Sequence, residues 1–412
     1  MTKRLILAFV FLSWHLVACS NGDSGISSGL PDKPSAEEDS PGTETISEEM
    51  RVKITGEDLY ISAKLDAKTD ILYWFKKCMF NELFTFYRVG TIDNNMPAPV
   101  TLPDASPTSL LNLAYSDNIG PFNITGYGWC GGNHPYLDEV TQTARNIGYR
   151  IYIDGKEIKT DLSTLTKEIK IEVINEIMNP SKADTSSGKT LLNEILCIET
   201  VNYSIYRNNI QVLVTHEFQN ESPVTVQMYY GMQSMFDKET HTLTANGKYV
   251  DWTVQKDVST FTKKEYPSFR RFIEKSANAY QSSYLFADGL GNHEEISDDD
   301  IIFIGNSSNK TYHKIIADRE HKKGDIIHWS GVYTWFKSPV SDDDDLLCYE
   351  GVIDNKKVLF IDCKKNVDRT IQLPVDYTKK SFTIIEKSKS ITITGNKVTA
   401  KGLRIVSDGS GS

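Results

Sequence analysis

The 412-residue sequence lacks the short motifs that identify several large enzyme classes. It has no P-loop, no dinucleotide-binding glycine fingerprint, no HExxH zinc motif and no GxSxG nucleophile motif. No CxxC spacing occurs among its six cysteines, which argues against the usual structural zinc sites. The formal net charge is -10 and no basic stripe is present, so nucleic acid is not expected as a partner.

The N-terminal apolar run, residues 5–17, is too short for a permanent membrane span. Lys3 and Arg4 precede it, and this arrangement is typical of a secretory signal peptide. The following Leu16-Val17-Ala18-Cys19 resembles the lipobox of bacterial lipoproteins, in which the cysteine takes a diacylglycerol and becomes the new N-terminus. The resemblance implies a signal peptide at residues 1–18 and a lipid anchor on Cys19. An ordinary cleaved signal with an incidental cysteine is the alternative.

Residues 19–50 are rich in Ser, Gly, Pro, Asp and Glu and contain almost no large apolar side chain. Such a segment buries too little surface to offset its ordering entropy, so we expect a flexible acidic tether. Its acidic bias resembles the segment that follows the lipidated cysteine in surface-exposed lipoproteins of Bacteroidota. That resemblance implies a protein of the cell envelope, anchored by lipid at the outer membrane and exposed at the cell surface.

Beyond the tether, alternating apolar and polar residues predict β-strands. The predicted strands are residues 51–54, 149–153, 169–177, 196–206, 210–218 and 224–230. Strands of this length joined by tight turns build large antiparallel sheets. We also expect one helix over residues 266–280, where Pro267 suits a first turn.

The segment from residue 341 onward differs in character, with an acidic run and short, closely spaced strands. We expect strands at residues 358–361, 382–385 and 391–394. Residues 51–340 are therefore expected to form a large antiparallel β-sandwich and residues 341–412 a small C-terminal β-domain. Cys348 and Cys363 could form a disulfide between neighbouring strands, or remain buried thiols.

Glycines and chemically versatile side chains gather in residues 116–136. Five glycines fall between residues 120 and 132, a density that excludes a helix or a strand interior. We expect a substrate-binding loop that faces a cleft, and the alternative is an Ω-loop packed on itself. The side chains expected to meet the substrate or to move its protons are Asp117, Tyr127, Trp129, Asn133, His134 and Tyr136.

The strands at residues 210–218 and 224–230 carry a second set of candidate residues. Alternation places His216 on one face with Val212 and Val214. If the two strands pair across a turn at Asn220, His216 and a tyrosine such as Tyr230 project onto one concave sheet surface. The alternative is a histidine beside an aromatic ring in a half-buried sheet.

These residues suit the cleavage of a uronic-acid polysaccharide by β-elimination. The reaction needs a group that neutralises the carboxylate, for which Asn133 or Arg145 is available. It also needs a base and a proton donor, for which His134, His216 or Tyr230 is available. Hydrolysis would instead use two carboxylates, and Asp117, Glu199 and Glu217 are the candidates.

Two acidic runs, residues 298–300 and 342–345, offer oxygen ligands for calcium. Neither has the spacing of an EF-hand loop, so solvated acidic loops are the simpler interpretation. We expect no other cofactor. Aromatic residues are abundant, with Tyr 20, Phe 17 and Trp 6, and most should fill a β-rich core while exposed rings could stack on sugars.

Together, the lipobox, the tether, the long antiparallel strands and the small β-tail resemble a surface lipoprotein of a Bacteroidota polysaccharide-utilisation system. Residues 51–340 are similar in expected architecture to the two-layer supersandwich of mutarotase-like and polysaccharide-lyase modules. The resemblance implies an all-β monomer that acts on a polysaccharide or oligosaccharide by lyase-type β-elimination. Non-catalytic glycan binding through the same surface is the alternative, and an adhesin or structural surface protein is a third.

Overall fold

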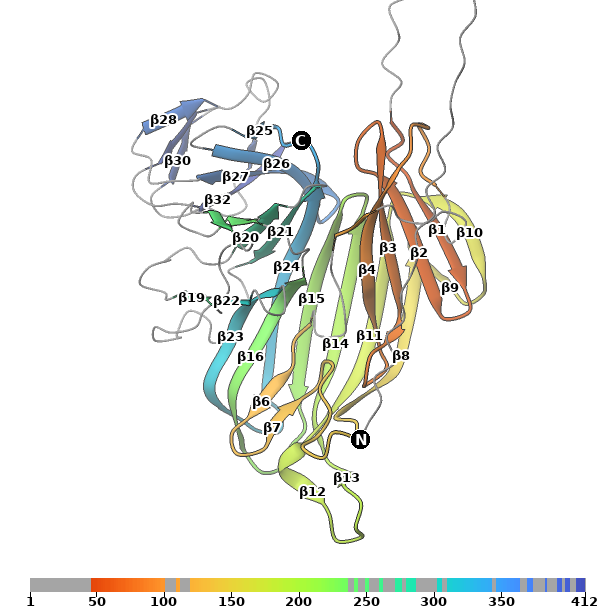
Figure 1. Cartoon of the computed structure of the whole chain (residues 1–412), viewed down its shortest axis with the longest axis vertical. Helices are drawn as coiled ribbons and strands as arrows, with labels where there is room; N and C mark the ends of the chain where they lie inside the picture. The colour runs from red at the N-terminus through yellow and green to blue at the C-terminus, as the bar shows by residue number, and fades with distance from the viewer. Residues whose placement is uncertain are drawn as a thin grey trace, which may run out of the picture. The chain divides into compact units, whose positions relative to one another are not determined.

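Antiparallel β-strands form almost all of the described chain, so the predicted all-β fold is confirmed (Figure 1). Within the described ranges the one helical element is a 3-10 turn, Pro180–Lys182. None of these residues forms a helix with the length and apolar character needed to span a membrane. The computed structural model describes residues 46–100, 109–111, 119–235, 241–243, 249–251, 259–261, 271–275, 279–286, 302–305, 310–342, 346–363, 369–372, 382–383, 391–394, 397–400 and 405–411.

The largest sheet has ten strands in the order β18-β17-β20-β21-β24-β15-β14-β11-β8-β9. Its central strands alternate buried and partly exposed side chains, as their sequences predict. Its strands are β8 (Ala144–Ile153), β9 (Lys156–Ile158), β11 (Ile169–Met178), β14 (Ile195–Tyr206), β15 (Asn209–Phe218), β17 (His241–Leu243), β18 (Tyr249–Asp251), β20 (Arg271–Lys275), β21 (Tyr280–Leu285) and β24 (Ile326–Phe336).

Two further sheets have six strands each. The N-terminal sheet, in the order β10-β1-β2-β3-β4-β5, comprises β1 (Met50–Thr55), β2 (Asp58–Lys64), β3 (Thr69–Cys78), β4 (Leu83–Asp93), β5 (Ser109–Leu111) and β10 (Leu162–Thr166). The second sheet, in the order β19-β22-β23-β16-β6-β7, comprises β6 (Phe122–Ile124), β7 (Gly128–Cys130), β16 (Val224–Met235), β19 (Ser259–Phe261), β22 (Ile302–Gly305) and β23 (Lys310–His321). A separate hairpin joins β12 (Ala183–Asp184) and β13 (Leu191–Leu192).

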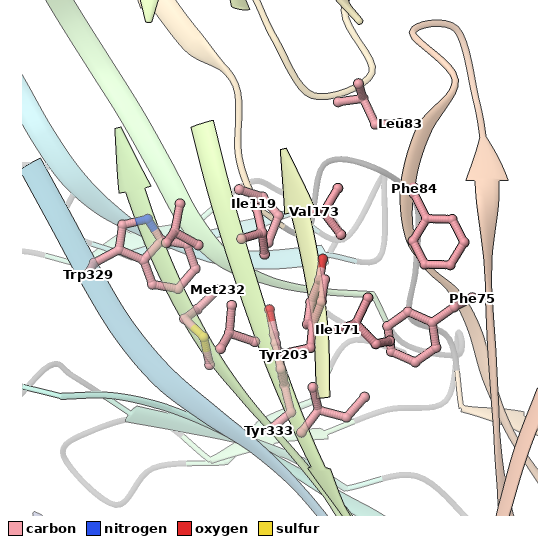
Figure 2. Close-up of a cluster of buried hydrophobic side chains, with 14 of the residues drawn as sticks. Phe75, Leu83, Phe84, Ile119, Ile171, Val173, Tyr203, Met232, Trp329 and Tyr333 are labelled. Atoms are coloured by element: carbon pink, nitrogen blue, oxygen red, sulfur yellow. The ribbon is translucent and has the colours of Figure 1, made fainter. Parts of the chain in front are cut away.

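Both six-stranded sheets pack against the same face of the ten-stranded sheet, and one hydrophobic cluster spans all three. Phe75 of the N-terminal sheet lies 5.4 Å from Tyr203, measured between ring centroids. Phe122 of the second sheet lies 4.8 Å from His216 by the same measure. Figure 2 shows Phe75 on the N-terminal sheet facing Tyr203. Burying a large side chain of this kind stabilises a fold by roughly 1.5–3 kcal/mol, so this shared interior is the main source of stability.

The strands from residue 341 onward pair among themselves, in one five-stranded and one three-stranded sheet. The five-stranded sheet packs on the other face of the ten-stranded sheet, where the rings of Phe336 and Tyr349 stack at 4.4 Å. Residues 45–412 nevertheless form one compact unit, so the domain boundary at residue 341 stays a prediction. These strands are β25 (Ser341–Asp342), β26 (Leu346–Ile353), β27 (Lys356–Cys363), β28 (Arg369–Gln372), β29 (Phe382–Thr383), β30 (Ile391–Thr394), β31 (Lys397–Ala400) and β32 (Ile405–Gly411).

The predicted hairpin across Asn220 is wrong. Strand β15 pairs with β14 and β24, whereas β16 pairs with β23 and β6, so the chain crosses from one sheet to another at this turn. The Asn220 side-chain amide donates to the backbone oxygen of His321 at 3.0 Å, and the backbone N of Lys323 donates to the backbone oxygen of Asn220 at 2.9 Å. The turn is thereby tied to the β23–β24 connection, which crosses between the same two sheets. The two strands form opposite walls of the core.

The predicted helix over residues 266–280 is also wrong in its described part. Residues 271–275 form β20 and Tyr280 begins β21, and Lys275 lies opposite Tyr280 in their pairing. Ile273 and Tyr280 are buried against the C-terminal five-stranded sheet, so tertiary packing overrides the local helical pattern. The predicted strands at residues 51–54, 149–153, 169–177, 196–206, 210–218 and 224–230 are confirmed.

Several predictions fall on residues outside the described ranges. These include the signal peptide, Cys19, all but the end of the tether, Asp117 and the acidic run at residues 298–300, so each stays a prediction. Cys348 lies opposite Ile361, and Cys363 lies opposite Leu346, so the two cysteines occupy diagonal positions on paired strands. Cys348 is a buried thiol outside any disulfide, so of the two alternatives the structure has the buried thiol.

Candidate functional site

Residues 125–143, here called the glycine loop, include the short strand β7, which the glycine density did not predict, and are fixed by hydrogen bonds to the turn between β3 and β4. Asn81 donates its side-chain amide to the backbone oxygens of Gly132 at 2.8 Å and His134 at 3.1 Å. Asn133 Oδ1 accepts from the backbone N of Phe80 at 2.7 Å. Asn133, predicted to meet the substrate, therefore uses its amide oxygen to position the loop. A loop fixed in this way is pre-organised for binding.

Two glycines allow the close backbone approaches that the sequence predicts here. Gly120 has a φ of +105°, and a Cβ at this position would lie 1.4 Å from the backbone oxygen of Tyr230. Gly131 has a φ of +76°, and its Cβ would lie 3.3 Å from Ile177 Cγ2. A side chain at Gly120 is therefore incompatible with the position of Tyr230.

Three of the predicted site residues come together as near-parallel rings, which we call the Trp129 stack. The Trp129 ring lies 5.3 Å from the His134 ring at an interplanar angle of 24°. It lies 6.1 Å from the Tyr230 ring at an angle of 22°. Trp129 comes from β7, His134 from the glycine loop and Tyr230 from β16, and all three are half-buried. The structure thus places Tyr230, which was expected beside His216, near Trp129 of the glycine loop, and the roles predicted for these residues stay predictions.

The glycine loop also exposes apolar side chains. Tyr127 is 42% exposed, Leu137 66% and Val140 77%. Between them, Asp138 accepts hydrogen bonds from the backbone N of Val140 and Thr141 and from the Thr141 hydroxyl. The hydroxyl hydrogen bonds from Thr141 and Thr190 hold the pKa of the Asp138 carboxyl below its usual range, so it is anionic at neutral pH. Exposed apolar groups gathered on an ordered loop are typical of a binding surface.

Arg145 and Tyr136, the remaining described candidates near the loop, have structural contacts of their own. The Arg145 guanidinium forms an ion pair with Glu176 on the neighbouring strand, and its side chain is 61% exposed. The backbone N of Tyr136 donates to the Thr141 oxygen at 2.8 Å, and the residue is half-buried. The positive charge expected to neutralise a uronate is therefore already matched by a carboxylate.

His216 lies in the core, where its side chain is 0% exposed. Its Nε2 is 3.0 Å from Glu199 Oε2, and Glu199 Oε1 accepts from Asn175 Nδ2 at 2.9 Å. Asn175 Oδ1 in turn accepts from Asn146 Nδ2 at 2.9 Å. These four residues, here called the polar ladder, lie directly opposite one another across four adjacent strands of the ten-stranded sheet. The polar ladder pairs buried polar groups inside an apolar interior, and of its ring nitrogens only His216 Nδ1 has no hydrogen-bond partner among the described residues.

The second sheet covers His216 with aromatic rings. Phe122 lies 4.8 Å and Tyr229 5.0 Å from the imidazole, both edge-on. The tyrosine beside His216 is thus Tyr229 and not Tyr230, because the two strands form opposite walls of the core. Burial raises the pKa of Tyr229 well above its usual value. A fully buried imidazole does not contact a polysaccharide, so His216 does not share a solvent-facing surface with the Trp129 stack.

The candidate carboxylates for hydrolysis are also separated. Glu199 is buried in the polar ladder, whereas Glu217 is exposed on the other face of the same sheet. Two carboxylates on opposite faces do not flank one glycosidic bond. No group of three or more metal-ligating side chains is found in the described part of the chain. Asp342, from the second acidic run, accepts a hydrogen bond from the Tyr280 hydroxyl at 2.7 Å.

The N-terminal sheet carries an aromatic row that sequence analysis did not single out. On its outer face the rings of Tyr60 and Trp74 stack at 5.4 Å, and Trp74 meets Tyr87 edge-on at 5.1 Å. Lys76 Nζ lies 4.4 Å from the centroids of both Trp74 and Tyr87. The available signal is the alternation in β3, which places Trp74 and Lys76 on one face.

A polar pocket of about 280 Å³ adjoins this row, between the β1–β2 turn and the β8–β9 hairpin. Its Asp58 accepts a hydrogen bond from Trp74 Nε1 at 2.9 Å, and its Glu57 pairs with Lys77 at 3.0 Å. Burial, followed by the charge of Glu57, raises the pKa of Tyr149. Its lining includes Glu57, Asp58, Tyr149, Arg150, Glu157 and Asp161. These residues come from separate turns, so no local sequence signal identifies the pocket.

Comparison with known proteins gives only distant likenesses. No family model and no curated protein matches the chain. Among solved structures, a glycoside hydrolase family 36 α-galactosidase, AgaB from Geobacillus stearothermophilus, matches with 9% identity and a TM-score of 0.39, over 70% of this chain and 41% of that one. A glycoside hydrolase family 97 enzyme from Pseudoalteromonas sp. strain K8 matches with 5% identity and a TM-score of 0.35, over 71% of this chain and 36% of that one.

The chain spans less than half the length of these solved structures. Their sequence identities and TM-scores are too low to carry an argument about this protein.

Proposed function

We propose that this protein is a cell-surface lipoprotein that binds a polysaccharide or oligosaccharide through the glycine loop. The observation that carries the proposal is the Trp129 stack, in which half-buried Trp129 lies near-parallel to His134 and Tyr230, and the exposed Tyr127 lies two residues before Trp129 in the chain. Flat aromatic groups suit the apolar faces of sugar rings, and the neighbouring imidazole, phenol and indole groups supply hydrogen-bonding atoms.

The rigidity of the loop favours binding. Asn81 and Asn133 fix its backbone, and Gly131 N donates to the Thr143 hydroxyl at 3.0 Å. A surface that is ordered before the ligand arrives loses little conformational entropy when it binds. The loop is thus better suited to a preformed binding face than to a closing lid.

The proposed location follows from the N-terminal sequence. The lipobox-like Leu16-Val17-Ala18-Cys19 would place diacylglycerol on Cys19, and the acidic tether would hold the folded part away from the membrane. We propose that the protein is anchored in the outer membrane and faces outward. A polysaccharide outside the cell would then reach the glycine loop without crossing a membrane.

Binding is favoured over β-elimination because the proposed catalytic residues are not assembled. His216 is buried in the core, and Arg145 is paired with Glu176. Lyase activity at the Trp129 stack would therefore rely on His134 and Tyr230, without His216 and without the Arg145 charge that was expected to acidify the sugar proton.

Two assays on the purified protein separate these functions. In affinity electrophoresis, a panel of neutral and uronic-acid polysaccharides is included in the gel, and retardation by at least one of them is expected. Incubation with the uronic-acid polysaccharides should give no rise in the ultraviolet absorbance of unsaturated sugar ends. A rise in that absorbance would instead establish a lyase. If no polysaccharide of the panel retards the protein and none gives a rise in absorbance, the proposed function is contradicted and an adhesin is favoured.

A further inference from the structure

A lysine, an aspartate and an asparagine are buried together at one end of the N-terminal sheet. Lys64 is the last residue of β2, Asp70 lies at the start of β3, and Asn94 directly follows β4. Lys64 and Asp70 are directly opposed in the strand pairing, and both are 0% exposed. Asp70 therefore lies on β3, the strand between β2, which carries Lys64, and β4, which leads to Asn94.

The Asp70 carboxylate contacts a different neighbour with each oxygen. Its Oδ1 lies 2.8 Å from Lys64 Nζ, and its Oδ2 accepts from Asn94 Nδ2 at 2.7 Å and from the backbone N of Val100 at 2.8 Å. Among the described residues Asp70 Oδ1 accepts no hydrogen bond. Its contact with the Lys64 amine is therefore an ion pair whose angles do not meet those of a hydrogen bond. Lys64 Nζ donates to the backbone oxygen of Asn94 at 2.7 Å, which holds the amine against this residue.

The side-chain amide of Asn94 is fixed and polarised. Its Oδ1 accepts from the backbone N of Met96 at 2.9 Å, and its Nδ2 also donates to the Ala98 oxygen at 2.8 Å. Its backbone N donates to the Lys68 oxygen at 2.8 Å. An N–H group directed at a carbonyl oxygen stabilises the negative charge that develops there when a nucleophile attacks the carbon. Nucleophile, proton carrier and polarised carbonyl are thus all present.

We propose that Lys64 and Asn94 form an intramolecular isopeptide bond, with Asp70 as the proton carrier. The bond forms between Lys64 Nζ and Asn94 Cγ while the bond between Cγ and Nδ2 breaks. Nζ keeps one of its three protons and passes two through Asp70 to Nδ2, which leaves as ammonium while Asp70 ends as the carboxylate. No oxidant, cofactor or water is consumed. The product ties β2 covalently to the segment after β4, across β3.

Peptide mapping of the purified full-length protein tests this reaction. The expected product is a branched peptide that joins the Lys64 and Asn94 segments, with the summed mass of the two linear peptides less one ammonia. Lys64→Arg and Asp70→Ala should abolish the branched peptide. Lys68→Arg, which changes an exposed lysine of the same β2–β3 turn, should retain it.

A succinimide at Asn94-Asn95 would also release ammonia, but it would leave the peptides unbranched and would persist in Lys64→Arg. Finding it, or recovering both peptides from the wild-type protein in linear form and full yield, would overturn the proposal. The wild-type map decides the question alone if a variant does not fold.

Discussion

Replacing Glu199 by alanine should destabilise the protein strongly, because this carboxylate is the central acceptor of the polar ladder. It accepts from Asn175 Nδ2 at 2.9 Å and contacts His216 Nε2 at 3.0 Å. Its removal leaves two buried polar partners without their acceptor, and each such loss is worth about 1–3 kcal/mol. Together with the cavity, we expect a loss of roughly 3–5 kcal/mol in the free energy of unfolding.

Thermal unfolding followed by circular dichroism measures this effect. A loss of this size should lower the midpoint by roughly 5 °C or more. Glu217→Ala is the matched control, because it removes an exposed carboxylate from the other face of β15 and should change stability by less than about 0.5 kcal/mol. Equal midpoints for the two variants would refute the argument that the ladder stabilises the core.

The remaining predictions concern pH, backbone geometry and the aromatic row. Burial, with the nearby Arg319, lowers the pKa of His321 from 6.5 to about 4. As the pH drops from 6.5 towards 4, His321 therefore takes up a proton in the unfolded chain but not in the folded one, and the free energy of unfolding should fall. His321→Gln should flatten this part of the pH profile in chemical denaturation, whereas His328→Gln, at an exposed position, should leave it unchanged. Gly120→Ala should unfold at a much lower temperature than Gly155→Ala, because a Cβ at Gly120 meets the Tyr230 oxygen at 1.4 Å and one at Gly155 meets nothing within 4 Å; similar midpoints would contradict the close approach. If the Trp129 ring is more accessible to solvent than the Trp74 ring, Trp129→Ala should lower the quenching of tryptophan fluorescence by small polar quenchers more than Trp74→Ala does. A larger reduction in Trp74→Ala would contradict this.

Local patterns in the sequence predict the strands well, because alternation reports directly which side chains face a core. The same patterns place Val212, Val214 and His216 on one face, and all three are buried there. Alternation does not say which sheet a strand joins, and this is why the Asn220 hairpin is wrong. That choice depends on the distant β23–β24 connection, to which Asn220 is hydrogen-bonded.

The candidate site divides in a similar way. The glycine loop is visible in the sequence because its glycines and its aromatic and polar residues lie within one short segment, and the Trp129 ring lies near the rings of both His134 and Tyr230. The aromatic row and the polar pocket are not visible, because their members come from strands and turns far apart in the chain. Asp58 and Trp74 meet only through the pairing of β2 with β3.

A polysaccharide that retards the wild-type protein in the gel is used to compare the affinities of Trp129→Ala, Trp74→Ala and the wild-type protein. If the Trp129 stack is the binding surface, Trp129→Ala should weaken the affinity by about 2 kcal/mol, or roughly thirtyfold, while Trp74→Ala binds like the wild type. Both variants should keep the wild-type circular dichroism spectrum. Unchanged affinity in a folded Trp129→Ala variant, with loss of binding in Trp74→Ala, would contradict the account and place the ligand at the pocket beside the aromatic row.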